Sequence, residues 1–569
     1  MAKFCNIMNN YETHFKTNEK GCVSYTTHGA SCDSSGILNE DIGLVALDSH
    51  LVRDSLNSNA IENMYDMIYN NILNNVSLDE KATYLRYLVK LVFKSRDIKD
   101  GNGERMIFYR LLLKLNEKYP DLVCNCLDII TGGYDMKTWK LVNMGKPIGS
   151  FVDLNNLYLL CCENSSINNI KLKNEIMRYI RLTLIKDKTE EHPTLCAKWL
   201  PREKKHIDKK TGFCLTLAKQ MASSDITKLS LLYKNYRKMY SDICNKLNIV
   251  ETKMAENLWS EINIKDVPSK AFLKYLKAFK YENKDGSLRQ PLKDDRMILR
   301  NKIFQEQRKA LENPESSVIN TATLMPHEIV SKVFDPNVSY SDLHSYNAIW
   351  NKYVCDFKSN FDNGILPPGI VLADVSLSMQ GIPMNVCIAL SIILSDLFEG
   401  PYKNKVITFE TEPRWHDIKG ELLTDKIRCL KSAPWGGSTN INAALKMILD
   451  VGRSNKLSNE EMPKVLYIFS DMQWDQADKT VTGFGNIKQM YSKYNYEMPT
   501  IVFWNLRHTD TFNNNSNQLN TKIMSGFSPN LFKQFMNGNF IETTPWTTLK
   551  DLLESDRYKC LDKKINDFC

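Results

Sequence analysis

The stretch GIVLADVSLS, residues 369–378, decides how the C-terminal part of this 569-residue chain folds. An apolar run is followed at once by a carboxylate and two hydroxyls, which is typical of a buried strand that ends in a polar loop. Further β-rich runs occur at residues 405–410, 464–471 and 499–506, and helical runs separate them. Because strands alternate with helices, we expect a Rossmann-like α/β domain with a mostly parallel sheet and helices on both faces.

Polar side chains collect where these predicted strands end. Ligands of open parallel sheets bind at this edge. The loop DVSLS (374–378) follows the first strand, WGGST (435–439) precedes a predicted helix, and the run KVLYIFS leads into an aspartate. Alternate residues of a loop leaving a strand point the same way, so the oxygens of DVSLS can converge. The candidate ligands are Asp374, Ser376, Ser378, Thr439 and Asp471.

These two carboxylates and three hydroxyls form an all-oxygen set. Such a set suits a hard octahedral cation, Mg2+ or Mn2+, and disfavours zinc and copper. For DVSLS alone, the alternative is a network that caps the following helix. A phosphoryl-accepting role for Asp374 would need a second carboxylate two residues on, where Ser376 stands instead. No nucleophile with a paired base is apparent, so we expect no enzyme.

In order and spacing, D-x-S-x-S, G-G-S-T and S-D resemble the metal-ion-dependent adhesion site of the von Willebrand factor A family. The resemblance covers residues 366–569. It implies a binding domain in which the three hydroxyls contact the cation directly and the carboxylates do so directly or through water. A carboxylate from a partner protein would complete the octahedron. The extra Ser438 departs from the family's Gly-Gly-Thr pattern, so either it or Thr439 fits as the ligand.

The first part of the chain has helical periodicity. Residues 81–96 and 104–119 carry apolar side chains at i, i+3, i+4 and i+7, and similar segments follow to about residue 304. We expect an all-α helical-repeat domain over residues 51–350, after a loose segment at residues 1–50. The fold class is therefore multidomain, with the α/β domain following the helices.

Positive charge is concentrated in the middle of the chain. Residues 198–310 hold 26 Lys and Arg against 13 Asp and Glu, a net charge of +13, whereas the whole chain carries +8. This asymmetry fits a polyanionic partner and a set of hydrated helix faces equally well. A basic run beside Trp199 fits RNA binding and a plain hydrated surface equally well. Its members are Lys198, Arg202, Lys204, Lys205, Lys209 and Lys210.

Two further features of the helical part have ordinary interpretations. Lys270, Lys274 and Lys277 share one face of a predicted helix, and an amphipathic helix with a hydrated lysine face explains them. Trp139 and Trp199 are expected in the core, because buried aromatic rings dominate packing.

Phrases of the helical part resemble the Ro/TROVE ribonucleoprotein family. RDIKDGNGER (96–105) and GGYDMKTW (132–139) resemble its two signatures, and DMQW (471–474) resembles the segment at its last metal ligand. LCAKWLPRE (195–203) and residues 251–259 match more closely an uncharacterised family in which a helical region precedes a von Willebrand A domain.

The Ro resemblance implies a HEAT-like ring whose basic surface binds structured or misfolded RNA, closed by the A domain. We therefore expect a non-enzymatic RNA-binding protein with a Mg2+ site. The alternative is a metal-dependent protein-interaction module whose helices serve as a scaffold.

Several classes of protein are disfavoured. The 15 cysteines include no C-x2-C pair, and their odd number fits reduced thiols better than disulfides or a structural zinc site. No apolar run approaches the roughly 18 residues of a membrane helix, and a secretory signal is absent. We expect a cytoplasmic protein without a membrane partner.

Overall fold

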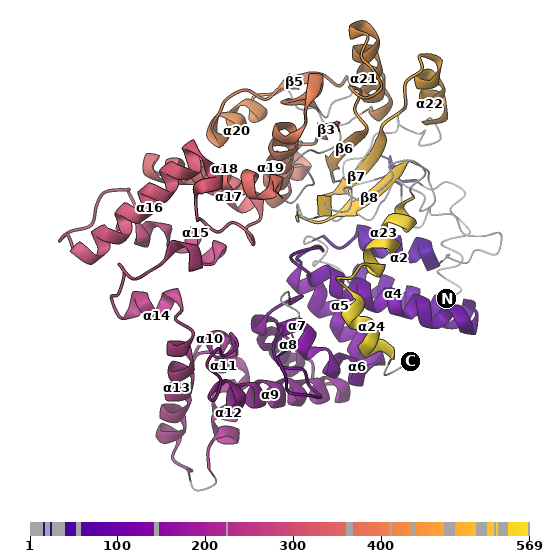
Figure 1. Cartoon of the computed structure of the whole chain (residues 1–569). Coiled ribbons are helices and arrows are strands. Elements are labelled where there is room, and N and C mark those ends of the chain that lie inside the picture. The colour runs from indigo at the N-terminus through magenta and orange to yellow at the C-terminus, as the bar shows by residue number, and fades with distance from the viewer. Residues whose placement is uncertain are drawn as a thin grey trace. The chain divides into compact units, whose positions relative to one another are not determined.

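A computed structural model describes most of the chain in two compact units (Figure 1). Unit 1 comprises Met1–Met64 and Asn263–Leu552, and unit 2 comprises Tyr65–Ile262 and Leu553–Cys569. The described residues are 15–17, 23–25, 40–52, 59–141, 147–223, 226–359, 368–408, 412–433, 440–471, 484–507, 520–528, 531–532 and 544–566. The multidomain order of helices followed by a mixed sheet is confirmed. The expected domain bounds stay predictions.

Helices make up the described part of unit 2. They are α3 (Ala60–Asn75, which begins in unit 1), α4 (Leu78–Arg96), α5 (Arg105–Lys118), α6 (Pro120–Asn125), α7 (Leu127–Thr131), α8 (Phe151–Glu163), α9 (Ile167–Asp187), α10 (Cys196–Trp199), α11 (His206–Thr211), α12 (Phe213–Met221), α13 (Leu229–Lys246), α14 (Val250–Ala255) and α24 (Lys559–Asn566). Neighbours along the chain pack in pairs: α4 with α5, α8 with α9 and α12 with α13. In α5 the buried side chains Phe108, Leu111, Leu112 and Leu115 recur at helical spacing, which explains this pairing.

The end of the chain packs on these helices. Helix α24 lies beside α4 and α6 (Figure 1). Just before it, Arg557 donates two hydrogen bonds of 2.7 Å to the Asp97 carboxylate, and from α24 Lys564 donates one of 2.6 Å to Asp128. Both carboxylates are buried. Because a buried carboxylate that loses its cation is costly, these pairs hold α24 on unit 2.

Unit 1 contains the sheet and the helices that cover it. Its helices are α2 (Glu40–Ser49), η3 (Ile264–Asp266), α15 (Ser269–Phe279), α16 (Asp294–Glu312), η4 (Pro314–Ser316), α17 (Pro326–Val333), α18 (Tyr340–Lys358), η6 (Leu377–Met379), α19 (Ile382–Leu397), η7 (Gly400–Tyr402), α20 (Leu423–Lys431), α21 (Ile441–Asn455), α22 (Phe484–Lys493) and α23 (Pro545–Glu554), the last of which ends in unit 2. Its strands are β1 (Phe15–Thr17), β2 (Val23–Tyr25), β3 (Gly369–Ala373), β4 (Lys405–Thr408), β5 (Trp415–Asp417), β6 (Val465–Ser470), β7 (Thr500–Asn505) and β8 (Thr521–Ser525). Strands β1 and β2 form a separate antiparallel pair.

The main sheet has the strand order β5-β4-β3-β6-β7-β8. All its pairings are parallel except that of β4 with the edge strand β5. Counted from β3 along the chain, this is the doubly wound order 3-2-1-4-5-6. The order reverses between β3 and β6, and a crevice for ligands forms at the carboxyl ends of two such strands.

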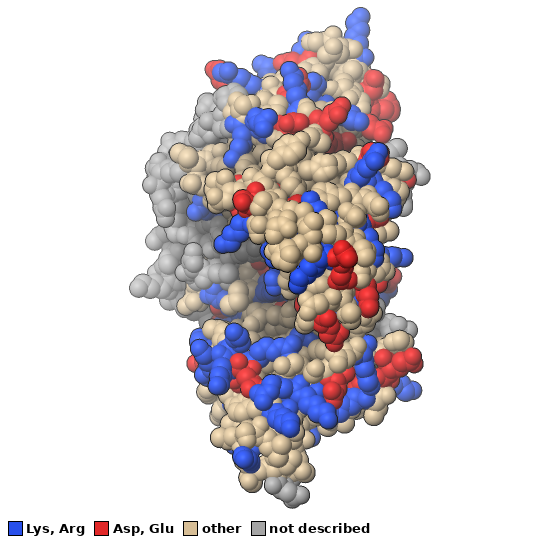
Figure 2. All heavy atoms as spheres, turned by 90° about the vertical axis from the view of Figure 1, so that its left-hand side faces the viewer, with Lys and Arg blue, Asp and Glu red and all other residues tan. Residues whose placement is uncertain are grey.

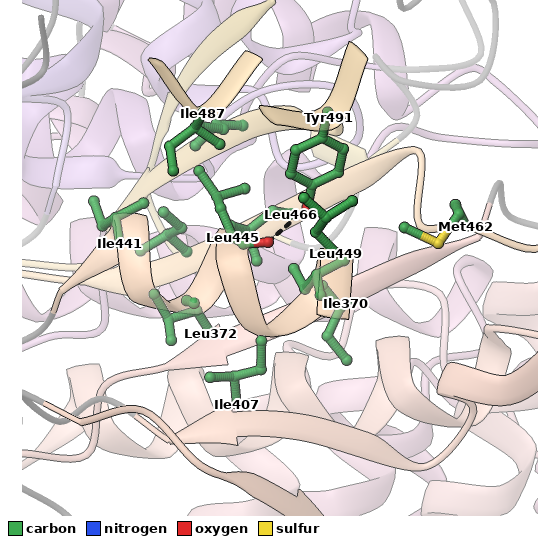
Figure 3. Close-up of a cluster of buried hydrophobic side chains, with 14 of the residues drawn as sticks. Ile370, Leu372, Ile407, Ile441, Leu445, Leu449, Met462, Leu466, Ile487 and Tyr491 are labelled. Carbon is green, nitrogen blue, oxygen red and sulfur yellow. Dashed lines mark hydrogen bonds between the residues drawn. The ribbon is translucent and has the colours of Figure 1, made fainter. Parts of the chain in front are cut away.

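Helices cover both faces of the sheet. On one face, α21 and α22 bury a cluster that includes Ile370, Leu445, Leu466 and Tyr491 (Figure 3). On the other face, α19 packs on β3, and α17 packs on α19 in turn. Nine consecutive side chains of α19, residues 386–394, have no exposed surface. A helix that is apolar on all sides needs partners on all sides, which explains why helices before the sheet belong to unit 1.

The N-terminal segment, expected to be loose, contains an ordered helix. In α2, Leu44 and Leu47 are fully buried, and the helix packs on β8. Asn505 at the end of β7 donates a hydrogen bond of 3.0 Å to the carbonyl of Ser49. The helix thus packs beside the carboxyl ends of β7 and β8, a contact between distant segments that local composition does not reveal.

The ion pair between Arg557 and Asp97 gives a prediction about stability. Replacing Arg557 with alanine leaves the buried Asp97 carboxylate without its bidentate cation, so we expect unit 2 to lose about 3 kcal/mol. Urea unfolding, with hydrogen exchange read at the junction of α4 and α5, measures the loss. The control is Lys559→Ala, because the ion pair of Lys559 with Asp556 is exposed and should contribute little. Equal exchange in both variants would contradict this role.

Candidate metal centre

Two aspartates lie at the crevice where the strand order reverses. Asp374 follows β3 and Asp471 follows β6, and these strands are neighbours with Ala373 opposite Phe469. The backbone N–H of Asp374 continues the ladder by donating to the carbonyl of Phe469 at 2.9 Å. Each aspartate is only 1% exposed. The parallel register therefore fixes two buried carboxylates at one edge of the sheet.

Hydroxyl groups surround Asp374. The backbone N–H of Ser376 donates to its Oδ1 at 2.9 Å, and the Ser470 hydroxyl donates to its Oδ2 at 3.0 Å. The Oγ atoms of Ser376 and Ser378 are 2.8 Å apart. The alternation in DVSLS thus brings its two hydroxyls together beside the carboxylate, as the spacing predicts.

The environment of Asp374 disfavours its negative charge. Burial and the nearby Asp471 carboxylate raise the pKa of Asp374 from 3.8 to about 7, although hydrogen bonds from Ser376 and Ser470 act in the opposite direction. A cation beside Asp374 would offset both causes. Carboxylate and hydroxyl oxygens are ligands for hard cations, so the described residues fit Mg2+ or Mn2+.

The fifth expected ligand, Thr439, lies outside the described residues, as do Ser438 and residues 472–474 of DMQW. Over the part of the chain that is described, no group of three or more His, Cys, Asp and Glu side chains is placed to hold a metal. A centre at Asp374 would therefore depend on serine or threonine hydroxyls as well as carboxylates.

Sequence reasoning missed two groups at this edge. The Arg507 guanidinium donates a hydrogen bond to the carbonyl of Ser378, and Leu377 between the two serines is 83% exposed. Arg507 comes two residues after β7, so the rule that polar residues collect at strand ends could have identified it. The exposed leucine provides an apolar contact next to the serine hydroxyls.

The six basic residues of the predicted RNA site divide into two groups. Lys204, Lys205 and Lys209 are exposed. The others have intramolecular contacts: Lys198 lies 3.3 Å from Glu251, Lys210 lies 2.6 Å from Glu163, and Arg202 stacks 4.0 Å from the centroid of the Tyr240 ring.

Helix α13 adds positive charge beside this run. The hydroxyl of Tyr236 on α13 donates to the carbonyl of Pro201 at 2.6 Å, which joins the helix to the start of the basic run. Lys234 and Lys238 on the same helix are exposed. Figure 2 shows basic side chains gathered over the part of the view that contains α13, with acidic ones among them.

The expectation for Trp199 was wrong. Its side chain is 42% exposed, because the short helix α10 ends there and α9 and α13 pack on the buried residues Cys196 and Ala197 instead. The Lys198 ammonium lies 5.5 Å from the centroid of the indole ring. Trp139 is half-buried, with its ring 6.0 Å from that of Tyr179.

The first of the two signatures expected from the sequence, RDIKDGNGER (96–105), forms the junction of α4 and α5. Arg96 makes two hydrogen bonds of 3.0 Å with the buried Asp153, and Asp97 binds Arg557. A Cβ at Gly101 would lie 2.1 Å from the carbonyl oxygen of Lys94, so only glycine fits there. These contacts give the signature a structural role within unit 2.

Two other expectations concern cysteines and membranes. The cysteines that the structure describes, from Cys124 to Cys560, are free thiols. Of the helices that the structure describes, none has both the length and the hydropathy to cross a bilayer.

Comparisons with known proteins lead to uncharacterised families. Residues 369–566 match a family model described as Domain of unknown function (DUF7788), and residues 179–361 match one described as Domain of unknown function (DUF2828). The chain is 28% identical over 484 residues to Uncharacterized protein L728 of Acanthamoeba polyphaga mimivirus, covering 82% of this chain and 79% of the relative. These matches support the expected similarity to an uncharacterised family. None of these matches shows a relation to the von Willebrand A family or to the Ro family.

The first match begins at the first residue of β3 and ends at the last residue of α24. It therefore includes the whole main sheet and both described aspartates of the candidate centre. The second match includes α10 to α18, with the basic run and α15.

The buried carboxylates give a prediction about pH. Because the pKa of Asp374 is raised in the folded chain, the metal-free protein should lose stability as pH rises from about 4 to about 7. Asp374→Asn removes the charge, so in EDTA at pH 8 it should be up to roughly 4 kcal/mol more stable than the wild type and nearly equal at pH 4. Urea unfolding at the two pH values tests this. Asp450→Asn, at an exposed aspartate, is the control, and equal shifts in both variants would contradict the prediction.

Proposed function

We propose that the chain is a non-enzymatic binding protein whose α/β domain is of the von Willebrand A type and holds Mg2+ or Mn2+. The ligands are Asp374, Ser376, Ser378, Thr439 and Asp471. The observation that carries this proposal is the oxygen cluster around Asp374, beside Asp471 and at the point where the strand order reverses. When bound, the cation supplies a coordination position for an oxygen ligand.

The surroundings of the cluster favour a protein as the ligand. A carboxylate of the partner would occupy the remaining position, and the exposed Leu377 would contact an apolar neighbour of that carboxylate. Arg507, held against the Ser378 carbonyl, adds positive charge at the same edge. Among the described residues, the cluster gathers carboxylate and hydroxyl oxygens around one buried side chain, an arrangement that supports the binding of a hard cation.

Metal binding can be tested by calorimetry and thermal unfolding. We expect Mg2+ and Mn2+ to raise the melting temperature of the wild type by several degrees, about 1–2 kcal/mol at saturating metal. Asp374→Asn and Ser376→Ala/Ser378→Ala should abolish the shift, because they remove ligands. The surface variant Asp450→Asn should retain it. An equal metal response in all four proteins would reject the site.

The partner can be sought with a displayed library of acidic peptides. Selection in Mg2+ followed by elution in EDTA should enrich peptides that the wild type binds and Asp374→Asn does not. Peptides bound equally by both proteins, or retained in EDTA, would argue against a coordinated carboxylate.

A second candidate function is RNA binding by unit 2. The exposed lysines at positions 204, 205 and 209, together with α13, form a basic surface, and Trp199 exposes part of its ring beside Lys198. Phosphates bind lysine, and unpaired bases stack on exposed aromatic rings. The HEAT-like arrangement of the Ro resemblance belongs to this proposal, supported by the consecutive helix pairs.

Fluorescence anisotropy with a structured RNA that has a single-stranded end tests RNA binding. We expect a steep salt dependence that Lys204→Glu/Lys205→Glu/Lys209→Glu flattens, by roughly 0.7 in log–log slope for each lysine that no longer neutralises a phosphate. The matched control is Lys171→Glu/Arg178→Glu/Lys188→Glu, three exposed charge reversals elsewhere in unit 2. An equal effect of both triple variants would point to nonspecific attraction and overturn the assigned surface.

A further inference from the structure

A pocket in unit 1 is lined by the lysine face of α15. It has a volume of about 480 Å³ and lies where α15 meets α17 and α18. This volume is in the range of small-molecule sites, roughly 300–1,000 Å³. The pocket shares no residue with the candidate metal centre or the basic surface of unit 2.

The walls of the pocket are strongly basic. Four lysines line it, against the single carboxylate of Glu328: Lys270, Lys274, Lys277 and Lys332. Lys274 and Lys332 are exposed. The Lys274 ammonium lies 5.0 Å from the centroid of the Tyr275 ring on the same helix. The excess of positive charge in a concave site favours a ligand with several negative charges.

Two of the lysines are held in place by carboxylates that are themselves fixed. Lys270 donates to Glu328 at 3.0 Å, and the other oxygen of Glu328 accepts the backbone N–H of Met325 at the start of α17. Lys277 lies 3.0 Å from Asp342, which also pairs with the buried Lys280 at 3.2 Å. Asp342 is buried and lies close to both lysines, so it fixes the position of Lys277 while offsetting part of the positive charge of the pocket.

The pocket also has apolar lining. Leu276, Leu324 and Tyr346 contribute to it, and each is less than 9% exposed. Leu273 on α15 adds a half-buried contact. Apolar side chains between ammonium groups suit a ligand that combines a flat ring with a chain of anionic groups.

We propose that this pocket binds a nucleoside polyphosphate, with the phosphates on the four lysines and the base against Leu273, Leu324 and Tyr346. The lysines act as point charges toward the phosphates. Because the apolar part of the pocket needs a ring to contact, a nucleoside polyphosphate should bind better than inorganic polyphosphate. The pocket thus gives α15 a role beyond that of an amphipathic helix with a hydrated face.

Isothermal titration of the full chain with ATP and GTP tests the proposal. EDTA in the buffer keeps the candidate metal centre out of the measurement. We expect binding of either nucleotide to weaken at least about tenfold in Lys274→Glu/Lys332→Glu, because two charge-assisted contacts become repulsive. Lys302→Glu/Lys358→Glu, at exposed lysines of α16 and α18 that do not line the pocket, should bind as the wild type does.

Further ligands test the two halves of the site. Tripolyphosphate and adenosine should each bind at least about tenfold more weakly than ATP, since each lacks half of the contacts. Equal affinity for tripolyphosphate and ATP would overturn the assignment of the base. Absence of ATP and GTP binding would overturn the proposal. Binding of an oligonucleotide with a 5′-triphosphate would not rescue it, because the proposed ligand is a free nucleotide. Loss of ATP binding in the Lys302/Lys358 variant to the same extent would also reject this pocket.

Discussion

The burial of α19 on all sides is the constraint on which unit 1 depends. A strand of this sheet needs cover on each face, but α19 needs cover on its outer side as well, because residues 386–394 expose no surface. Helix α17 provides that cover and lies beside α18. The helices that precede the sheet in sequence are therefore part of its core. This requirement also brings α17 and α18 to α15, where the lysine pocket forms.

The same sheet concentrates charge in an unfavourable place. Parallel pairing of β3 with β6 fixes Asp374 and Asp471 at neighbouring strand ends, out of water. Natural proteins retain such costly arrangements mainly where they serve binding or catalysis. Hydrogen bonds from Ser376 and Ser470 moderate the cost but do not remove it, since the pKa of Asp374 stays raised. The stability of the domain and its proposed ligand are thus linked through one cluster.

Much of this could be predicted from local patterns. Residues 369–378 predicted both β3 and the convergence of Asp374, Ser376 and Ser378, because a strand's period and its terminal loop are properties of adjacent residues. Contacts between distant segments could not be predicted in this way. Several contacts join residues that share no local signal in the sequence. They are the ion pair of Arg557 with Asp97, the packing of α2 on β8, and the ion pairs of Lys270 and Lys277. The exposure of Trp199 was missed for the same reason, since it depends on which side of α10 its neighbours cover.

The return of α24 to unit 2 has a consequence for synthesis on the ribosome. Helices α4 to α14 emerge early, but Arg557 and Lys564 are translated only after Asn263–Leu552. Until then Asp97 and Asp128 lack these two cations, and the surface of α4 that receives α24 is open to chaperones. The helical unit therefore completes its fold after unit 1 has been made. Any ribosome that stops inside the sheet leaves a product whose helices are less stable than those of the full chain, and which proteases can recognise.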